Sequence, residues 1–190
     1  EALLKVHCTK KPLAKDVEHD ALAAKSAGSS GADLANIANE SAIIAARNSH
    51  AQISQGDVTE AFERVAIGPE RKSKVMTDRD KEVTAYHEAG HALVGQVLPD
   101  SDPVHKVTII PRGGTGGVTW FIPPEDRMFV SLVQFKDMLA RGLGGRIAEE
   151  IILGPDKITT GAGSDLPNAA NLARDMIVNQ GMGSQRPSTP

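Results

Sequence analysis

The sequence predicts a mainly α-helical protein with one small β-hairpin, an α+β fold whose two halves differ in character. Apolar residues recur at steps of three and four through 32–47 and again through 55–66, which is the period of amphipathic helices. Two β-rich runs, Val104–Ile110 and Val118–Ile122, flank the glycine-rich segment 111–117. That arrangement is typical of a hairpin, and we expect helices on both sides of it.

The first half is predicted to be a small helical unit. Glu1–Thr9 is expected to form a short helix that ends before Pro12, because proline cannot continue a helix. A second helix is expected over Asp20–Ala27, ahead of a loop at Gly28–Gly31. The two amphipathic helices then complete the unit, which we expect to end at residue 68.

A charged stretch that contains proline and glycine separates the halves, and we predict a linker over 69–76. The second half begins with Thr77 and Asp80, a capping pattern ahead of a helix expected over Asp78–Val97. Beyond the hairpin, two further helices are expected, over Ser131–Leu153 and Ser164–Gln180.

Composition narrows the possible functions. Of the 190 residues, 40% are hydrophobic and 24% are charged, which suits a soluble globular protein. Aromatic residues make up only 3%, so the core must be mainly aliphatic, and Gly142–Gly145 permits close helix packing. The net charge of -3 argues against a nucleic-acid partner. A single cysteine, Cys8, excludes an internal disulfide and a cysteine-based zinc finger.

The segment His87–His91 carries a His-Glu-x-x-His pattern on the helix predicted over 78–97. Residues four apart share a helix face, so His87 and His91 can present both imidazoles to one metal ion. Glu88 lies beside them and can act as general base toward a water that zinc activates. Two surface histidines on an ordinary helix are the alternative. The apolar residues around the motif argue against this alternative, because they predict that the helix is buried. These residues are Val83, Ala85, Ala89, Ala92, Leu93 and Val94.

A catalytic zinc needs three protein ligands and an open position, and the residues alone leave the third ligand undecided. The downstream carboxylates are Glu149, Glu150, Asp156, Asp165 and Asp175. Asp165 follows segment 159–163, which we expect to be flexible, and begins the last helix, where an acid also favours the helix dipole without any ligand role. Glu149 and Glu150 are its rivals, and a solvated helix face is their alternative role. The choice between Asp165 and this pair is evenly divided.

Four segments of the second half carry a family resemblance: Ala85–Ala92, Lys106–Gly113, Leu143–Glu150 and Thr159–Ala162. They resemble the zinc helix and following motifs of the FtsH family of membrane-anchored, ATP-dependent AAA+ zinc proteases. In the first half, Gly31–Leu34 resembles the helical lid of the AAA module. The resemblance covers nearly the whole chain. It implies a helical AAA lid over 1–68 and a zincin-like, mostly helical metallopeptidase domain over 77–190.

The resemblance also implies roles for individual residues. Asp165 would be the third zinc ligand, with Glu149 or Glu150 as a supporting residue hydrogen-bonded to a zinc-binding histidine. Gly31 and Ala32 would lie against the adenine of ATP. The alternative for these two residues is a helix start with no nucleotide contact.

Two parts of the family pattern are absent from the sequence. There is no Gly-x-x-x-x-Gly-Lys-Ser/Thr loop for phosphates and no apolar run long enough to span a membrane. Segment 184–190 does not resemble the later helices of the peptidase domain. We therefore expect a soluble fragment, with a C-terminally truncated peptidase domain, of a longer protein. That protein would bind ATP mainly elsewhere and attach to a bacterial inner membrane or an organelle membrane (mitochondrial or plastid).

The function that follows is ATP-dependent zinc endopeptidase activity on unfolded or unassembled proteins, including membrane proteins, in a homo- or hetero-hexamer. One alternative is a catalytically inactive structural subunit of such a hexamer, against which the intact Glu88 argues. A stand-alone zincin is the other, and the lid-like first half argues against it. We further predict that substrate pairs in extended form with the later part of Val104–Ile110, at the rim of the cleft.

Overall fold

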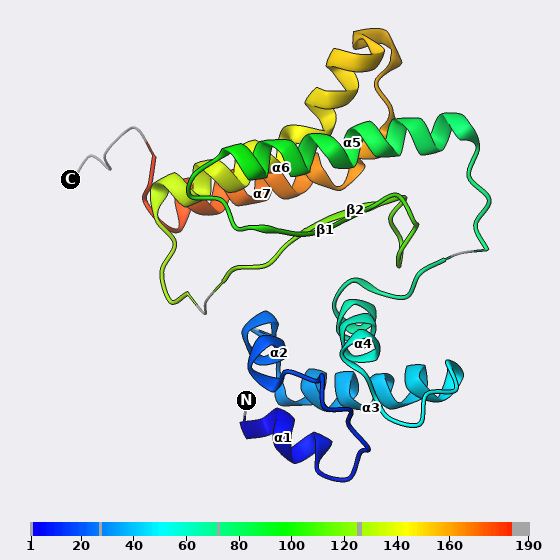
Figure 1. The fold of residues 1–190 in the computed structure, drawn as a ribbon. Helices are drawn as coiled ribbons and strands as arrows, with labels where there is room; N and C mark the ends of the chain where they lie inside the picture. Colours follow the sequence, from blue (N-terminus) through cyan, green and yellow to red (C-terminus); the bar gives the residue numbers. More distant parts are fainter. Residues whose placement is uncertain (1, 27, 72, 125–126, 184–190) are drawn as a thin grey trace. The chain divides into compact units, whose positions relative to one another are not determined.

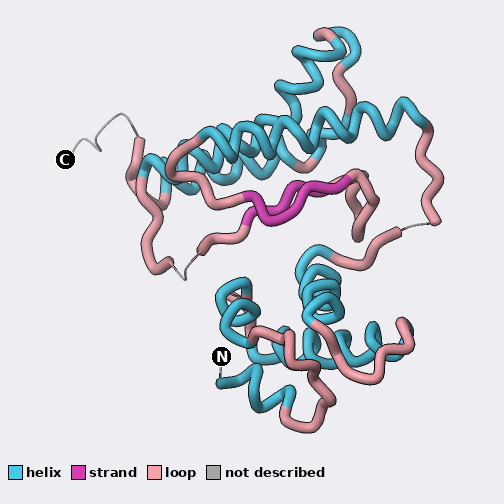
Figure 2. The backbone as a smooth tube through the Cα atoms, viewed as in Figure 1, coloured by secondary structure: helices cyan, strands magenta, loops and turns pink. Residues whose placement is uncertain are grey.

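The computed structural model describes residues 2–26, 28–71, 73–124 and 127–183. Helices dominate, and the described residues contain one sheet, an antiparallel pair of short strands (Figure 2). The predicted fold class, mainly α with a small hairpin, is confirmed. The chain divides into two compact units. Unit 1 comprises the described residues of Glu1–Arg71 and Pro123–Asp126, and unit 2 those of Lys72–Ile122 and Arg127–Pro190.

Unit 1 is a small bundle of four helices (Figure 1). They are α1 (Ala2–Cys8), α2 (His19–Lys25), α3 (Gly31–Arg47) and α4 (Gln55–Ile67). Helices α3 and α4 each start with a capping box, in which the side chain of Ser30 or Ser54 accepts from the backbone N–H three residues later. Aliphatic and aromatic side chains from all four helices and the loops between them fill the core, including Leu4, Leu22, Ile37, Ile53, Val58 and Phe62.

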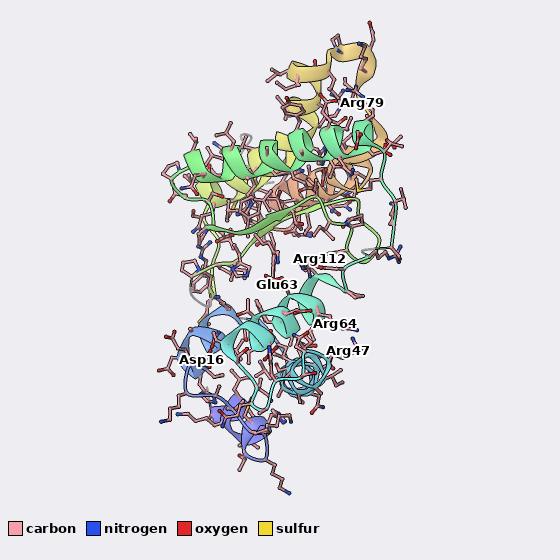
Figure 3. The ribbon with its side chains drawn as sticks, turned by 45° about the vertical axis from the view of Figure 1, so that its right-hand side comes forward. Asp16, Arg47, Glu63, Arg64, Arg79 and Arg112 are labelled. Carbon is pink, nitrogen blue, oxygen red and sulfur yellow. The ribbon has the colours of Figure 1, made fainter. Side chains whose placement is uncertain are left out.

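Two charged contacts tie α3 and its following loop to α4. Arg64 of α4, which is labelled in Figure 3, pairs with Glu40 of α3 at 3.1 Å. Asp57, in the first turn of α4, is buried and accepts hydrogen bonds from Ser54, His50 and Asn48. Burial alone would raise the pKa of Asp57, but these hydrogen bonds outweigh it and lower the pKa from 3.8 to about 2. The folded unit therefore favours the ionised carboxylate.

Replacing Asp57 with asparagine is expected to destabilise unit 1 by about 2 kcal/mol at neutral pH. Because the folded pKa lies below the unfolded one, this stabilisation is complete above the unfolded pKa and is lost as pH falls from about 4 to about 2. Hydrogen exchange of α4 amides at several pH values measures the difference. Asp33→Asn changes the equivalent cap of α3 at an exposed position. It should destabilise unit 1 less than Asp57→Asn does. If the stability difference between wild type and Asp57→Asn is as large at pH 2 as at pH 7, the proposed role of the ionised Asp57 is wrong.

Unit 2 contains three long helices and the hairpin (Figure 1). The elements are α5 (Asp78–Val97), β1 (Val104–Thr108), β2 (Val118–Phe121), α6 (Leu132–Leu153), the 3-10 turns Pro155–Lys157 and Thr160–Gly163, and α7 (Asp165–Val178). Helix α6 packs against both α5 and α7, and both strands of the hairpin contact α5. In the hairpin, Val107 pairs with Thr119 and Thr108 with Val118, with one irregularity between Val104 and Lys106.

The face that α5 buries is not the one its apolar residues predict. Leu93 and Val97 are 68% and 73% exposed, and Ala85 and Ala89 are exposed as well. The buried residues are His87, Glu88, His91 and Gly95. Helix α5 is therefore buried as expected, but through its polar stripe rather than its apolar flanks. Among the described residues, no helix has the length and apolar character needed to cross a membrane.

Candidate metal centre

A cleft of about 980 Å³ opens within unit 2. Helix α5 forms one wall, the glycine-rich turn and β2 form another, and α6, residues 159–161 and the first half of α7 form the rest. All four residues predicted to act at the zinc site line this cleft; they are His87, Glu88, His91 and Asp165. Residues far apart in the sequence thus meet in one place.

The strand at the cleft is β2. Segment 114–119 and Phe121 line the cleft, whereas no residue of Val104–Ile110 does. The prediction that the later part of Val104–Ile110 meets substrate at the rim is therefore wrong. Position in the sequence directly after α5 could not distinguish the strands, because both lie against that helix.

Three potential ligand atoms form a small triangle. The Nε2 atoms of His87 and His91 are 3.1 Å apart, and Oδ2 of Asp165 lies 3.1 Å from the first and 3.5 Å from the second. Ligands bound tetrahedrally to zinc at about 2.0–2.1 Å are about 3.3–3.4 Å from one another. The spacing of the three atoms therefore suits three corners of a zinc tetrahedron, and the fourth corner is left for water or substrate.

The Nδ1 atom of each imidazole has a hydrogen-bond partner that sets the orientation and tautomer of the ring. Nδ1 of His87 is 2.7 Å from a carboxylate oxygen of Glu149, and Nδ1 of His91 is 2.7 Å from the backbone carbonyl of Arg141. Both partners are acceptors, and we therefore assign a donated proton to each Nδ1. At His91 the Arg141 carbonyl at 2.7 Å is nearer to Nδ1 than the competing Gly145 N–H at 3.3 Å. In the neutral rings, both Nε2 lone pairs then face each other and Asp165. Two ring nitrogens and a carboxylate this close together need positive charge between them, which protons on the rings or a bound metal ion would supply.

The charge preferences of the three groups agree with this need. Burial disfavours imidazolium, but hydrogen bonds to Asp165 and Glu149 outweigh it and raise the pKa of His87. Asp165 and the Arg141 carbonyl outweigh burial in the same way at His91, whose pKa is also raised. At Asp165, burial works toward the neutral acid, yet the two histidines hold the pKa of the carboxyl well below its usual range. The site is built to keep a carboxylate beside positive charge.

The other carboxylates occupy different surroundings. Glu149 is fully buried behind His87, where Oε2 accepts from the Thr159 backbone N–H at 2.7 Å. Burial raises the pKa of Glu149, but bonds to Thr159 and His87 outweigh it and lower the pKa. Glu150 points outward and pairs with Arg146 at 3.0 Å. A solvated helix face thus describes Glu150 and is wrong for Glu149.

Glu88 lies in the cleft beside the histidines and is 6% exposed. Its Oε2 accepts from the hydroxyl of Thr119, on β2, at 2.7 Å. Burial raises the pKa of Glu88 and outweighs the opposite effects of Thr119 and the two histidines. A carboxylate with a raised pKa is a stronger base, which is what proton transfer at near-neutral pH requires.

Glycines bring α6 against the metal side of α5. Gly90 and Gly144 face each other, and a Cβ on either would lie within 2.6 Å of the other's carbonyl oxygen. At Gly145 a Cβ would lie 2.5 Å from Nε2 of His91 and 2.6 Å from Nε2 of His87. The predicted role of Gly142–Gly145 in close packing is therefore met by Gly144 and Gly145, while nothing lies within 4 Å of a Cβ built on Gly142.

Sequence reasoning did not identify Thr119, Thr159 or the Arg141 carbonyl as parts of the site. A threonine in a β-rich run and a backbone carbonyl inside a helix carry no local pattern that indicates such roles. Segment 159–163, expected to be flexible, instead forms a 3-10 turn in which Thr159 caps the Gly161 N–H at 3.0 Å. Gly31 and Ala32 are exposed at the start of α3 in unit 1. Their contact with adenine stays a prediction.

Comparison with known proteins agrees with this geometry. The model of peptidase family M41 matches residues 74–187. The chain belongs to that family. An AAA+ lid domain model matches residues 16–60. The M41 and lid matches together confirm the resemblance to the FtsH family of AAA+ zinc metalloproteases.

Relatives of this M41 chain share about half of its residues. An ATP-dependent zinc metalloprotease FtsH from Chloroflexus aggregans is 56% identical over 186 residues, 97% of this chain and 28% of the relative. One from a Synechococcus species is 51% identical over 181 residues, 95% of this chain and 28% of the relative. FtsH 3 from a Synechocystis species is 50% identical over 183 residues, 95% of this chain and 30% of the relative. The chain thus spans less than a third of the length of these relatives.

Proposed function

We propose that this chain carries the active site of a zinc metalloendopeptidase. His87 and His91 would hold the ion through their Nε2 atoms and Asp165 through a carboxylate oxygen, with Glu88 as general base. The observation that carries this proposal is the triangle of ligand atoms at 3.1, 3.1 and 3.5 Å. Both imidazoles turn their Nε2 atoms into that triangle, and the Glu88 carboxylate lines the same cleft.

Zinc bound there would supply Lewis-acid chemistry, since it lowers the pKa of water and polarises a peptide carbonyl. Glu88 accepts a proton from the attacking water and returns it to the leaving amine nitrogen as the peptide bond breaks. Glu149 and the Arg141 carbonyl hold the imidazoles in the tautomer that leaves Nε2 free. Glycine-rich segment 114–117 and β2 border the space in which an extended peptide would lie.

For the whole protein, we propose ATP-dependent degradation of unfolded or unassembled proteins by a hexamer attached to a membrane through a segment outside this chain. The names of the relatives support ATP dependence and zinc proteolysis, and the lid match supports an AAA+ module. Gly31 and Ala32 would contribute to the nucleotide site. The runner-up is an inactive structural subunit of such a hexamer, and the intact, buried Glu88 beside the histidines disfavours it.

Glu88→Gln should abolish peptide hydrolysis and leave zinc binding intact, because the amide keeps the size of the side chain but cannot accept the proton. General-base loss lowers the rate by roughly 10²–10⁴-fold. Hydrolysis of an unfolded protein measures the rate, and elemental analysis of the same sample should find about one zinc per chain. Glu82→Gln, at an exposed position of the same helix, is the matched control and should change neither.

Each outcome separates the candidates. A folded chain without zinc rules out the metal site, and Glu88→Gln with the original rate rules out Glu88 as base. Zinc-loaded wild-type protein that hydrolyses nothing would favour the inactive structural subunit.

A further inference from the structure

Alternate residues of β2, together with the glycine just before it, face α5 in order. A Cβ on Gly117 would lie 2.7 Å from Thr84 and 2.8 Å from Oε1 of Glu88. Two residues later, Thr119 reaches Glu88 through its hydroxyl. After two more residues, the Phe121 ring packs against Gly95 of α5 so closely that a Cβ on Gly95 would lie 2.3 Å from Cε1 of the ring. Because side chains alternate along a strand, the strand meets α5 through one face, and the register places Thr119 opposite Glu88.

Among the described residues of unit 2, the Thr119 hydroxyl hydrogen-bonds to Glu88 alone. It lies 2.7 Å from Oε2 and 2.9 Å from the backbone carbonyl oxygen of Glu88. Both atoms are acceptors, so the hydroxyl proton is directed at this one residue, and the shorter bond goes to the carboxylate. A glutamate side chain has three rotatable bonds, and one hydrogen bond at its end restricts the rotamers it can adopt.

From this geometry we propose that Thr119 is a positioning residue for the general base. Its hydroxyl holds one carboxylate oxygen of Glu88, and the absence of a side chain at Gly117 leaves space for the other. The base is thereby set against the metal side of the cleft before substrate arrives. The hairpin then serves the chemistry as well as bordering the peptide. This inference rests on the proposed role of Glu88 as the base.

Thr119→Val removes the hydroxyl and keeps a β-branched side chain that suits a strand. The expected result is a fall in kcat on the order of 100-fold, the cost of a catalytic group misplaced by about 1 Å. KM and zinc content should stay at wild-type values, because the zinc ligands are untouched and valine keeps the size and branching of the threonine that lines the cleft. Thr119→Ser keeps the hydroxyl and should restore most of the lost rate. The matched control is Thr108→Val on β1, whose hydroxyl accepts from the Ile110 N–H instead.

A crystal structure of Thr119→Val gives a readout that does not depend on activity, and the Glu88 carboxylate should be displaced in it. A carboxylate that stays in place, or an unchanged kcat, overturns the proposal. So does a serine variant as slow as the valine variant, since packing of the methyl group would then be the cause. Loss of zinc from Thr119→Val would assign the residue to the ligands instead. An inactive wild-type chain counts against the proposed function, whereas the position of Glu88 in the variant still decides the role of Thr119.

Discussion

Asp165→Ala is expected to lower zinc affinity more than any other single carboxylate change in this chain. Among the described residues, Asp165 alone supplies a carboxylate oxygen within 3.5 Å of both histidine Nε2 atoms, and its loss leaves two ligands. Removing a group that only supports a ligand costs about 10–100-fold in metal affinity, so losing a ligand should cost more than about 100-fold. Competition with a chromophoric zinc chelator measures the affinity at fixed pH.

Two glutamates provide graded controls for Asp165. Glu149→Ala removes the acceptor for Nδ1 of His87. We expect it to lower the zinc affinity by about 10–100-fold. Glu150→Ala affects an exposed pair with Arg146 and should leave the affinity unchanged. If Glu149→Ala proves more damaging than Asp165→Ala, zinc is bound by the glutamate, and the triangle of ligand atoms has been misinterpreted.

The helices were predictable because their determinants are local. Steps of three and four in α3 and α4 and the capping residue Thr77 gave boundaries within one or two residues of those observed. The 3-10 turn at Thr160–Gly163 was missed, since a glycine-rich segment looks flexible until a fixed partner is known. That partner is Glu149, which accepts from the backbone of Thr159 and lies on a different helix.

The metal site was predictable only in part, for the same reason. His87, Glu88 and His91 lie within one turn and a half of a single helix, and their spacing alone indicates a shared face. Asp165 lies on α7, and no periodicity links it to α5. The residues therefore left it level with Glu149 and Glu150, and the family resemblance favoured it. The structure separates these acids by burial and by the atoms they contact.

The apolar neighbours of the motif gave a correct conclusion for a wrong reason. They predicted a buried α5, yet Ala85, Ala89 and Leu93 are exposed, and the buried stripe contains two histidines and a glutamate. Burial of such polar groups is costly unless each is paired. Glu149, the Arg141 carbonyl, Asp165 and Thr119 supply those pairs. The polar stripe can therefore be buried because the site is complete.

Gly145→Ala is expected to abolish zinc binding at stoichiometric concentrations although it alters no ligand. The added Cβ would lie 2.5 and 2.6 Å from the two Nε2 atoms, about 1 Å closer than carbon atoms pack at optimal separation. Either the imidazoles turn away or α6 moves back, and in both cases the ligand triangle opens. Moving α6 would also separate Gly90 from Gly144, so a loss of stability should accompany the loss of zinc.

Gly142→Ala separates this steric effect from a general effect of alanine in α6. It makes the same change one turn earlier, where nothing lies within 4 Å of the new Cβ, and alanine in a helix should stabilise it by roughly 0.5–1 kcal/mol. Zinc affinity and thermal unfolding, measured on both variants with and without zinc, should therefore diverge. Gly142→Ala keeps the metal and its stabilisation, whereas Gly145→Ala shows no shift on adding zinc, because an ion stabilises only the fold that binds it. Wild-type zinc affinity in Gly145→Ala would mean that the histidine nitrogens do not meet over the backbone of α6, and the proposed ligand geometry would have to be abandoned.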